Sequence, residues 1–263
     1  NLFLESNRVL KQQTKPFFAV IQTADNHRPY SIPAEDKNEF KLLTYSADSL
    51  KRFGFESNEE MNAFRYTDFS YQKFMEAAKK EPYFKNTIFV FVGDHGIRYN
   101  GSLEYFPKSW TEQGLTCEHV PLLFYAPALL KPQRVHNVCS QIDILPSIAS
   151  LAKIPYMNNS LGRNLFDTVA YAQVLGHDEI IPRLPKYTAF VIDHDLHTIG
   201  IVNNQYYYLK NLKTGKDDLV SSIGNNPVKE SAETDSVKNY LQQLTDAYYE
   251  TSKYLLLNNK KRK

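Results

Sequence analysis

Side chains that could bind a metal ion or an anion occur beside three short apolar runs of this sequence. Asp94 and His95 come just after one such run. His27 and Arg28 come just after another, and His119 stands just before a third. Carboxylate and imidazole groups are natural ligands for a divalent cation of the zinc or manganese type. The sequence therefore offers a carboxylate, three imidazoles and a guanidinium for one site, provided that the fold brings them together.

The tetrapeptide Gly93-Asp94-His95-Gly96 carries the strongest of these signals. Adjacent side chains of a continuing strand point to opposite faces, so Asp94 and His95 can share one metal ion only if the chain turns. The two glycines permit such a turn. The alternative is structural: Asp94 caps a helix, while His95 packs or faces water.

The surrounding elements predict an α/β fold. The runs at 17–23, 87–92 and 120–125 are typical of strands buried on both faces. The segments 67–80 and 143–154 predict helices, the second with an aspartate near its start. This alternation favours a mostly parallel central sheet flanked by helices, and such sheets bind ligands beyond the carboxyl ends of their strands. The connection at 93–119 is long and aromatic, and we expect it to be an ordered loop of the active site.

The pattern changes after about residue 167. The runs at 188–192 and 199–209 predict antiparallel strands with a tight turn at Asn203-Asn204. Residues 236–257 predict a closing amphipathic helix. We therefore expect an α/β domain over 1–167 and a smaller β-rich subdomain with a closing helix over 168–263.

Composition limits the function classes. Lys and Arg total 31 and Asp and Glu total 29, so the formal charge is 31 − 29 = +2. A dedicated nucleic-acid-binding protein would show a larger basic excess, so no nucleic-acid partner is expected. Hydrophobic residues make up 42% of the chain, which excludes a wholly disordered protein. No apolar run approaches the roughly 18–20 residues that a membrane-spanning helix needs.

Taken together, the motifs resemble the sulfatase/alkaline phosphatase superfamily. Two of them are similar to its membrane-anchored branch, the lipoteichoic acid synthase-like phosphoglycerol transferases, namely DNHRPY at 25–30 and RYTD at 65–68. The others are the GDHG stretch after TIFVFV (87–96), HVPLLFYAP at 119–127 and SQIDILP at 140–146. The likeness extends over roughly residues 15–167 and implies an alkaline-phosphatase-like fold.

The resemblance also implies roles for the candidate residues. Asp94 and His95 match the pair that ligates the catalytic metal, most often manganese or zinc, with calcium or magnesium as alternatives. His27 and His119 match positions that contact the transferred group or a second metal. Arg28 is expected to bind an anionic oxygen, since a planar guanidinium suits phosphate and sulfate.

One part of the family pattern is missing. Family members carry an acidic metal ligand and a nucleophilic Thr or Ser upstream, or in true sulfatases a Cys or Ser converted to formylglycine. Neither Cys117 nor Cys139 stands in the Cys/Ser-x-Pro-x-Arg pattern. We therefore expect the chain to be the C-terminal part of a longer enzyme, inactive alone, with its catalytic nucleophile upstream.

Three functions follow as alternatives. The first is a metal-dependent phosphoglycerol transferase-type enzyme of the cell envelope, acting on a lipid- or glycan-linked phosphate ester. The second is a true sulfatase acting on sulfate esters. The third is a non-catalytic module that binds anionic glycans or lipid headgroups. The resemblance implies an extracytoplasmic location, with a membrane anchor in the part that precedes this chain.

Overall fold

The computed structural model describes residues 2–99, 105–167 and 187–258. It divides into two compact units, each assembled from three stretches of the sequence. The first unit takes Asn1–Phe91, Arg98–Tyr105 and Leu123–Lys131, and the second takes Val92–Ile97, Phe106–Leu122 and Pro132–Lys263. Each unit has a hydrophobic core of its own.

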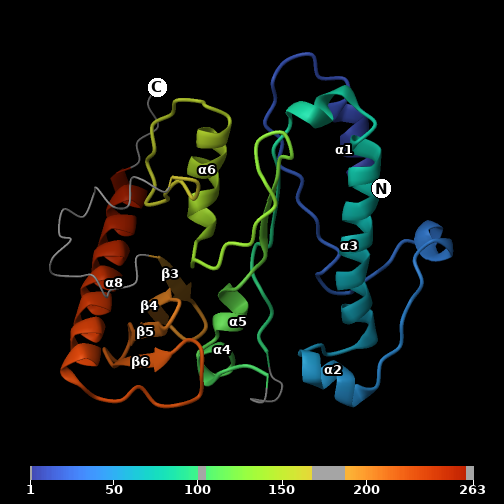
Figure 1. Cartoon of the computed structure of the whole chain (residues 1–263). Coiled ribbons are helices and arrows are strands. Elements are labelled where there is room, and N and C mark those ends of the chain that lie inside the picture. Colours follow the sequence, from blue (N-terminus) through green and yellow to red (C-terminus); the bar gives the residue numbers. More distant parts are fainter. Residues whose placement is uncertain (1, 100–104, 168–186, 259–263) are drawn as a thin grey trace. The chain divides into compact units, whose positions relative to one another are not determined.

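Helices dominate the first unit. They are α1 (Leu2–Leu10), η1 (Ala34–Asn38), α2 (Ala47–Phe53), α3 (Asn58–Ala78) and η2 (Pro82–Asn86). The long helix α3 lies beside α1 (Figure 1). It begins at Asn58 rather than at residue 67, because the Ser57 side chain accepts a hydrogen bond from the Glu60 amide and caps the helix. The Ser-x-x-Glu spacing is a start signal that the sequence already contained.

The core of the first unit lies between these helices and strand β1. Phe3, Phe74, Ala78 and Phe89 are its buried members. Phe89 opens β1 (Phe89–Val92), which pairs with β2 (Leu122–Tyr125) in a two-stranded sheet. The strands expected at 87–92 and 120–125 are therefore present, each slightly shorter than predicted, but Val92 and Leu123 are 39% and 54% exposed, so the expected burial on both faces is not confirmed.

The prediction of a strand over residues 17–23 was wrong. The segment runs without strand pairing to any described residue. Phe17 packs edge-on against Tyr83, whereas Phe18 and Val20 are 71% and 80% exposed. Apolar sequence alone cannot create a strand, since the backbone needs a neighbouring strand to complete its hydrogen bonds. The mostly parallel central sheet is accordingly not confirmed, although the mixed α/β character is.

A four-stranded antiparallel sheet forms the centre of the second unit. Its order is β3 (Thr188–Asp193), β4 (Thr198–Asn203), β5 (Tyr206–Asn211) and β6 (Asp217–Ser221). The predicted turn after β4 is confirmed, and the Asn203 side chain accepts hydrogen bonds from the amides of Gln205 and Tyr206. Sequence patterning missed β6, because its first two residues are both aspartates.

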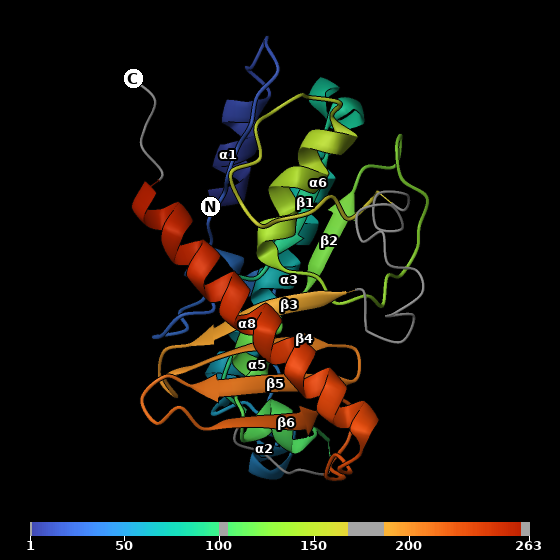
Figure 2. The same ribbon diagram turned by 90° about the vertical axis from the view of Figure 1, so that its left-hand side faces the viewer.

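Helical layers cover both faces of this sheet. The closing helix α8 (Ala232–Asn258) crosses one face (Figure 2), where Ile201 and Tyr208 meet Leu241. The opposite face presents Tyr207 and Leu209, which pack with residues of two short helices, α4 (Lys108–Thr111) and α5 (Leu115–Glu118). Successive strand residues point to opposite faces, so one sheet supports both layers. The predicted antiparallel sheet with a closing helix is confirmed.

The helix expected over 143–154 is present as α6 (Ile144–Leu151), preceded by the 3-10 turn η3 (Gln141–Asp143). The domain boundary expected at residue 167 adjoins residues 168–186, which lie outside the described residues, and it stays a prediction. Within the described ranges, no helix combines the length and the apolar character needed to cross a membrane.

Candidate active site

The Gly93–Gly96 turn follows directly after β1. The Gly93 amide donates to the carbonyl oxygen of Pro121 over 3.4 Å, and the Gly96 amide donates to that of Cys117 over 2.6 Å. A Cβ atom on Gly96 would lie 2.0 Å from the Thr116 carbonyl oxygen. The turn therefore packs so closely against residues 116–121 that only glycine fits at position 96.

Asp94 and His95 face one another within this turn. The Asp94 Oδ2 and His95 Nε2 atoms are 3.9 Å apart, and Asp94 Oδ1 accepts a hydrogen bond of 2.9 Å from the His95 amide. Their side chains are 83% and 73% exposed. Asp94 caps no helix, so that part of the structural alternative does not hold.

The tautomer of His95 follows from its other ring nitrogen. His95 Nδ1 lies 2.8 Å from the carbonyl oxygen of Gly96, which can only accept a hydrogen bond. Nδ1 therefore carries the proton in the neutral ring, and Nε2 keeps a free lone pair toward Asp94. This is the arrangement that metal-ligating histidines use.

The separation of the pair can be compared with that of two ligands in a metal site. Ligand atoms that bind zinc lie about 2.0–2.2 Å from the ion, so in the tetrahedral geometry that zinc prefers two of them stand about 3.3–3.6 Å apart. The 3.9 Å between Oδ2 and Nε2 is a few tenths of an ångström wider than this separation. Across the described ranges, no cluster of three or more His, Cys, Asp or Glu side chains could hold a metal ion.

His119 stands at the C-terminal end of α5, where its amide donates to the Leu115 carbonyl oxygen over 3.0 Å. Its ring meets the Trp110 ring edge-on, with centroids 4.9 Å apart. Trp110 in turn donates its indole N–H to the Ser222 carbonyl oxygen over 2.8 Å. The small sheet thus supports the segment that carries His119. Partial burial lowers the pKa of this imidazole, which favours its neutral form.

His27 and Arg28 belong to the first unit, whereas Asp94, His95 and His119 belong to the second. His27 is exposed, and its Nδ1 lies 3.0 Å from the Arg28 carbonyl oxygen. Arg28 forms an ion pair with Glu56, and both side chains are largely exposed. An anionic ligand of Arg28 would therefore compete with this carboxylate.

Sequence reasoning assigned no role to Gln141. Its side-chain amide nitrogen donates to the carbonyl oxygens of Gly93 and Asp94 over 2.6 and 2.8 Å. Gln141 lies inside the motif at 140–146, but its partners are more than 45 residues away in sequence. Only a spatial contact reveals its position beside the turn.

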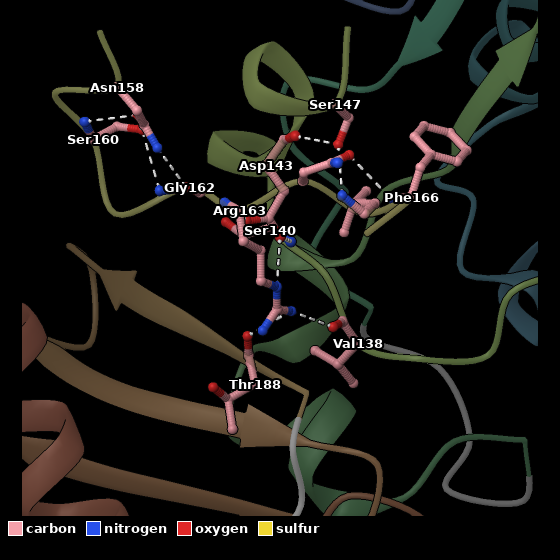
Figure 3. Close-up of polar contacts among 12 residues, drawn as sticks. Val138, Ser140, Asp143, Ser147, Asn158, Ser160, Gly162, Arg163, Phe166 and Thr188 are labelled. Atoms are coloured by element: carbon pink, nitrogen blue, oxygen red, sulfur yellow. Dashed lines mark hydrogen bonds and ion pairs between the residues drawn. The ribbon is translucent and has the colours of Figure 1, made fainter. Parts of the chain in front are cut away.

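A buried polar cluster fixes the element that carries Gln141. Asp143 is 2% exposed, and its carboxylate accepts hydrogen bonds of 2.9 Å from the amides of Ser140 and Arg163. The Arg163 guanidinium reaches the carbonyl oxygens of Val138 and Thr188 over 2.7 and 3.2 Å (Figure 3). Asp143 stands at the N-cap position of α6, but its side chain makes no capping hydrogen bond to that helix; instead it forms a capping box with Ser140 in the preceding η3 turn.

This chain belongs to the sulfatase family, whose model, described as Sulfatase, matches residues 1–154. Lipoteichoic acid synthase 1 of Bacillus subtilis is 29% identical over 232 residues, which are 83% of this chain and 34% of the relative. Arylsulfatase K of Gallus gallus is 30% identical over 148 residues, 54% of this chain and 26% of the relative. The resemblance seen in the motifs is confirmed.

Solved structures share the fold. A protein of the alkaline phosphatase superfamily from Vibrio parahaemolyticus superposes with a TM-score of 0.64 at 21% identity, and the match covers 95% of this chain and 54% of that protein's chain. The lipoteichoic acid synthase LtaP from Listeria monocytogenes superposes with a TM-score of 0.61 at 16% identity, and the match covers 97% of this chain and 58% of the LtaP chain. The chain spans about a quarter to a third of the two curated relatives and just over half of these structures.

Proposed function

We propose that this chain is part of a metal-dependent enzyme that acts on phosphate or sulfate esters. The observation that carries the proposal is the Asp94–His95 pair, with a carboxylate oxygen and the imidazole Nε2 3.9 Å apart on an exposed turn after β1. Manganese and zinc suit this donor set. A bound divalent cation would act as a Lewis acid and neutralise charge on the oxygens of the transferred group.

The candidate residues of the chain have different proposed roles. Asp94 and His95 are the proposed metal ligands, and the tight packing of Gly96 holds them on a fixed turn. Neutral His119 is suited to accept a proton or a hydrogen bond at its unprotonated ring nitrogen. His27 and Arg28 are proposed to contact the transferred group or a second metal. None of these residues is assigned as the nucleophile, which we expect in the part of the protein that precedes this chain.

Phosphoglycerol transfer is the reaction that we favour. Lipoteichoic acid synthase 1 aligns with 83% of this chain, including part of the region after residue 167, whereas arylsulfatase K aligns with 54%. The proposed substrate is a lipid- or glycan-linked phosphate ester, handled on the extracytoplasmic face of a membrane. A true sulfatase is the second candidate, because the 30% identity to arylsulfatase K is similar to the 29% identity to lipoteichoic acid synthase 1.

Calorimetric titration with Mn²⁺ and Zn²⁺ tests the proposed metal site. Two ligands should bind weakly, with a Kd of tens of micromolar, which corresponds to about 6 kcal/mol. The double variant Asp94→Ala/His95→Ala should lose this binding. A matched double variant, His194→Ala/Asp195→Ala, removes an adjacent imidazole and carboxylate from the loop between β3 and β4 and should bind like the original chain. Equal loss in both double variants, or in neither, would count against the site.

A further inference from the structure

The two hydrogen bonds of Gln141 converge on the backbone just before His95. Both acceptors, the oxygens of Gly93 and Asp94, are carbonyl oxygens that cannot donate. The orientation of the Gln141 amide is therefore unambiguous, since only its NH₂ group can face them. One side chain thus restrains two consecutive peptide groups at the start of the turn.

Gln141 is itself held in place from two sides. On one side, the capping box between Ser140 and Asp143 closes the η3 turn, and the buried Asp143 carboxylate also accepts a hydrogen bond from the Arg163 backbone amide (Figure 3). On the other side, Gly162 approaches so closely that an added Cβ would lie 1.9 Å from the Ile142 carbonyl oxygen. The backbone that carries Gln141 is therefore tightly restrained before any ligand arrives.

The far end of the Gly93–Gly96 turn has a separate restraint, the hydrogen bond from the Gly96 amide to the Cys117 carbonyl oxygen. Between these two anchors, the side chains of Asp94 and His95 remain exposed. The backbone is fixed while its functional groups stay open, which is the arrangement that a pre-organised ligand pair requires.

We propose that Gln141 is a positioning residue, which holds the Gly93–Gly96 turn so that the Asp94 carboxylate and His95 Nε2 face one another. The role in ligand binding rests on the proposed metal site, whereas the restraint on the turn does not. Removal of the amide should loosen the turn and weaken metal binding while leaving the cores of both units unchanged.

Two readouts on the full 263-residue chain test this role. In Gln141→Met and Gln141→Leu, which lack the donor but keep a side chain of similar size, we expect the amides of residues 94–96 to exchange hydrogen about tenfold faster. We expect Mn²⁺ affinity by calorimetry to fall about tenfold. Exchange in β4 and α8 should stay the same. Gln243→Met and Gln243→Leu, at an exposed glutamine of α8, should alter neither readout.

The readouts separate the two claims. Unchanged exchange at residues 94–96 in the Gln141 variants would overturn the positioning role. Faster exchange with unchanged Mn²⁺ affinity would overturn its connection to ligand geometry. If the original chain binds no Mn²⁺ while exchange still rises in the variants, the restraint on the turn is supported and the proposed metal site fails.

Discussion

At the scale of single residues, the exposed histidines His27 and His95 share one local arrangement. In each, Nδ1 lies within hydrogen-bond distance of the carbonyl oxygen of the following residue, at 3.0 Å for His27 and 2.8 Å for His95. Each carbonyl selects the tautomer with Nδ1–H, so Nε2 is the nitrogen left for a ligand. The backbone of each loop therefore determines which atom of the side chain can react.

His119 differs because its environment acts on its charge. Partial burial lowers its pKa, so NMR should show its ring titrating below the value of about 6.5 of a free imidazole. The variant His119→Gln assigns the signal. Because the folded chain binds this proton less tightly than the unfolded chain, His119 should contribute a loss of stability as the pH falls through about 6.5. When urea unfolds the chain, the pH midpoint of the His119 titration should rise. A titration midpoint in the folded chain at or above that in the unfolded chain would contradict the prediction.

At the scale of elements, the close approach of the Gly93–Gly96 turn to α5 decides where the candidate ligands lie. The turn has no regular secondary structure of its own, and its position depends on the Cys117 carbonyl at one end and Gln141 at the other. Helix α5 is in turn packed on the small sheet through Leu115. The geometry of the candidate ligands thus depends on elements far from them in sequence.

Substitution of Gly96 tests this dependence. In Gly96→Ala the new Cβ would lie 2.0 Å from the Thr116 carbonyl oxygen, and backbone would have to move. We expect a loss of about 1–3 kcal/mol in the free energy of unfolding, measured by urea denaturation. Gly224→Ala is the matched control, since its nearest neighbour would be 3.9 Å away, and it should change stability by less than about 1 kcal/mol. Equal losses in the two variants would mean that the close approach has no energetic weight.

Several elements could be predicted from the sequence because their signals are local. The apolar alternation of β4 and β5, the asparagine turn between them and the stripe of α8 are examples. The adjacent Asp94 and His95, the candidate ligands of the turn, are a local signal too, and their role stays a prediction. The 17–23 segment was mispredicted, because pairing depends on a neighbour that local sequence does not specify. The contact of Gln141 with Gly93 was missed for the same physical reason, since it joins residues that are 48 positions apart.

At the scale of the whole molecule, the hydrophobic cores of the two units share no residue among those that the structure describes. Phe74 belongs to the core of the first unit, and Leu241 is fully buried in the second. The single tryptophan, Trp110, lies in the second unit, so its fluorescence reports that unit, whereas far-UV circular dichroism reports both.

Core substitutions should therefore separate the signals. Leu241→Ala should lower the free energy of unfolding by about 2–5 kcal/mol and should move the fluorescence-detected unfolding transition to a lower urea concentration. Phe74→Ala, which removes about 3–5 kcal/mol, should move only part of the circular dichroism transition and leave fluorescence in place. If Phe74→Ala shifts the fluorescence transition as far as Leu241→Ala does, the chain unfolds as one cooperative body.

The interleaving of the two units has a consequence for anyone who wishes to divide the protein. The chain passes from one unit to the other five times, after residues 91, 97, 105, 122 and 131. No single cut can release either unit intact. A cut after residue 91 separates the Gly93–Gly96 turn from strand β1, and a cut after residue 97 or 105 separates it from Pro121, whose carbonyl oxygen accepts a hydrogen bond from the Gly93 amide. Domain swaps between relatives would therefore have to exchange residues 89–122 as one segment, which keeps the turn with strand β1 and with the carbonyl oxygens that accept hydrogen bonds from its two glycine amides.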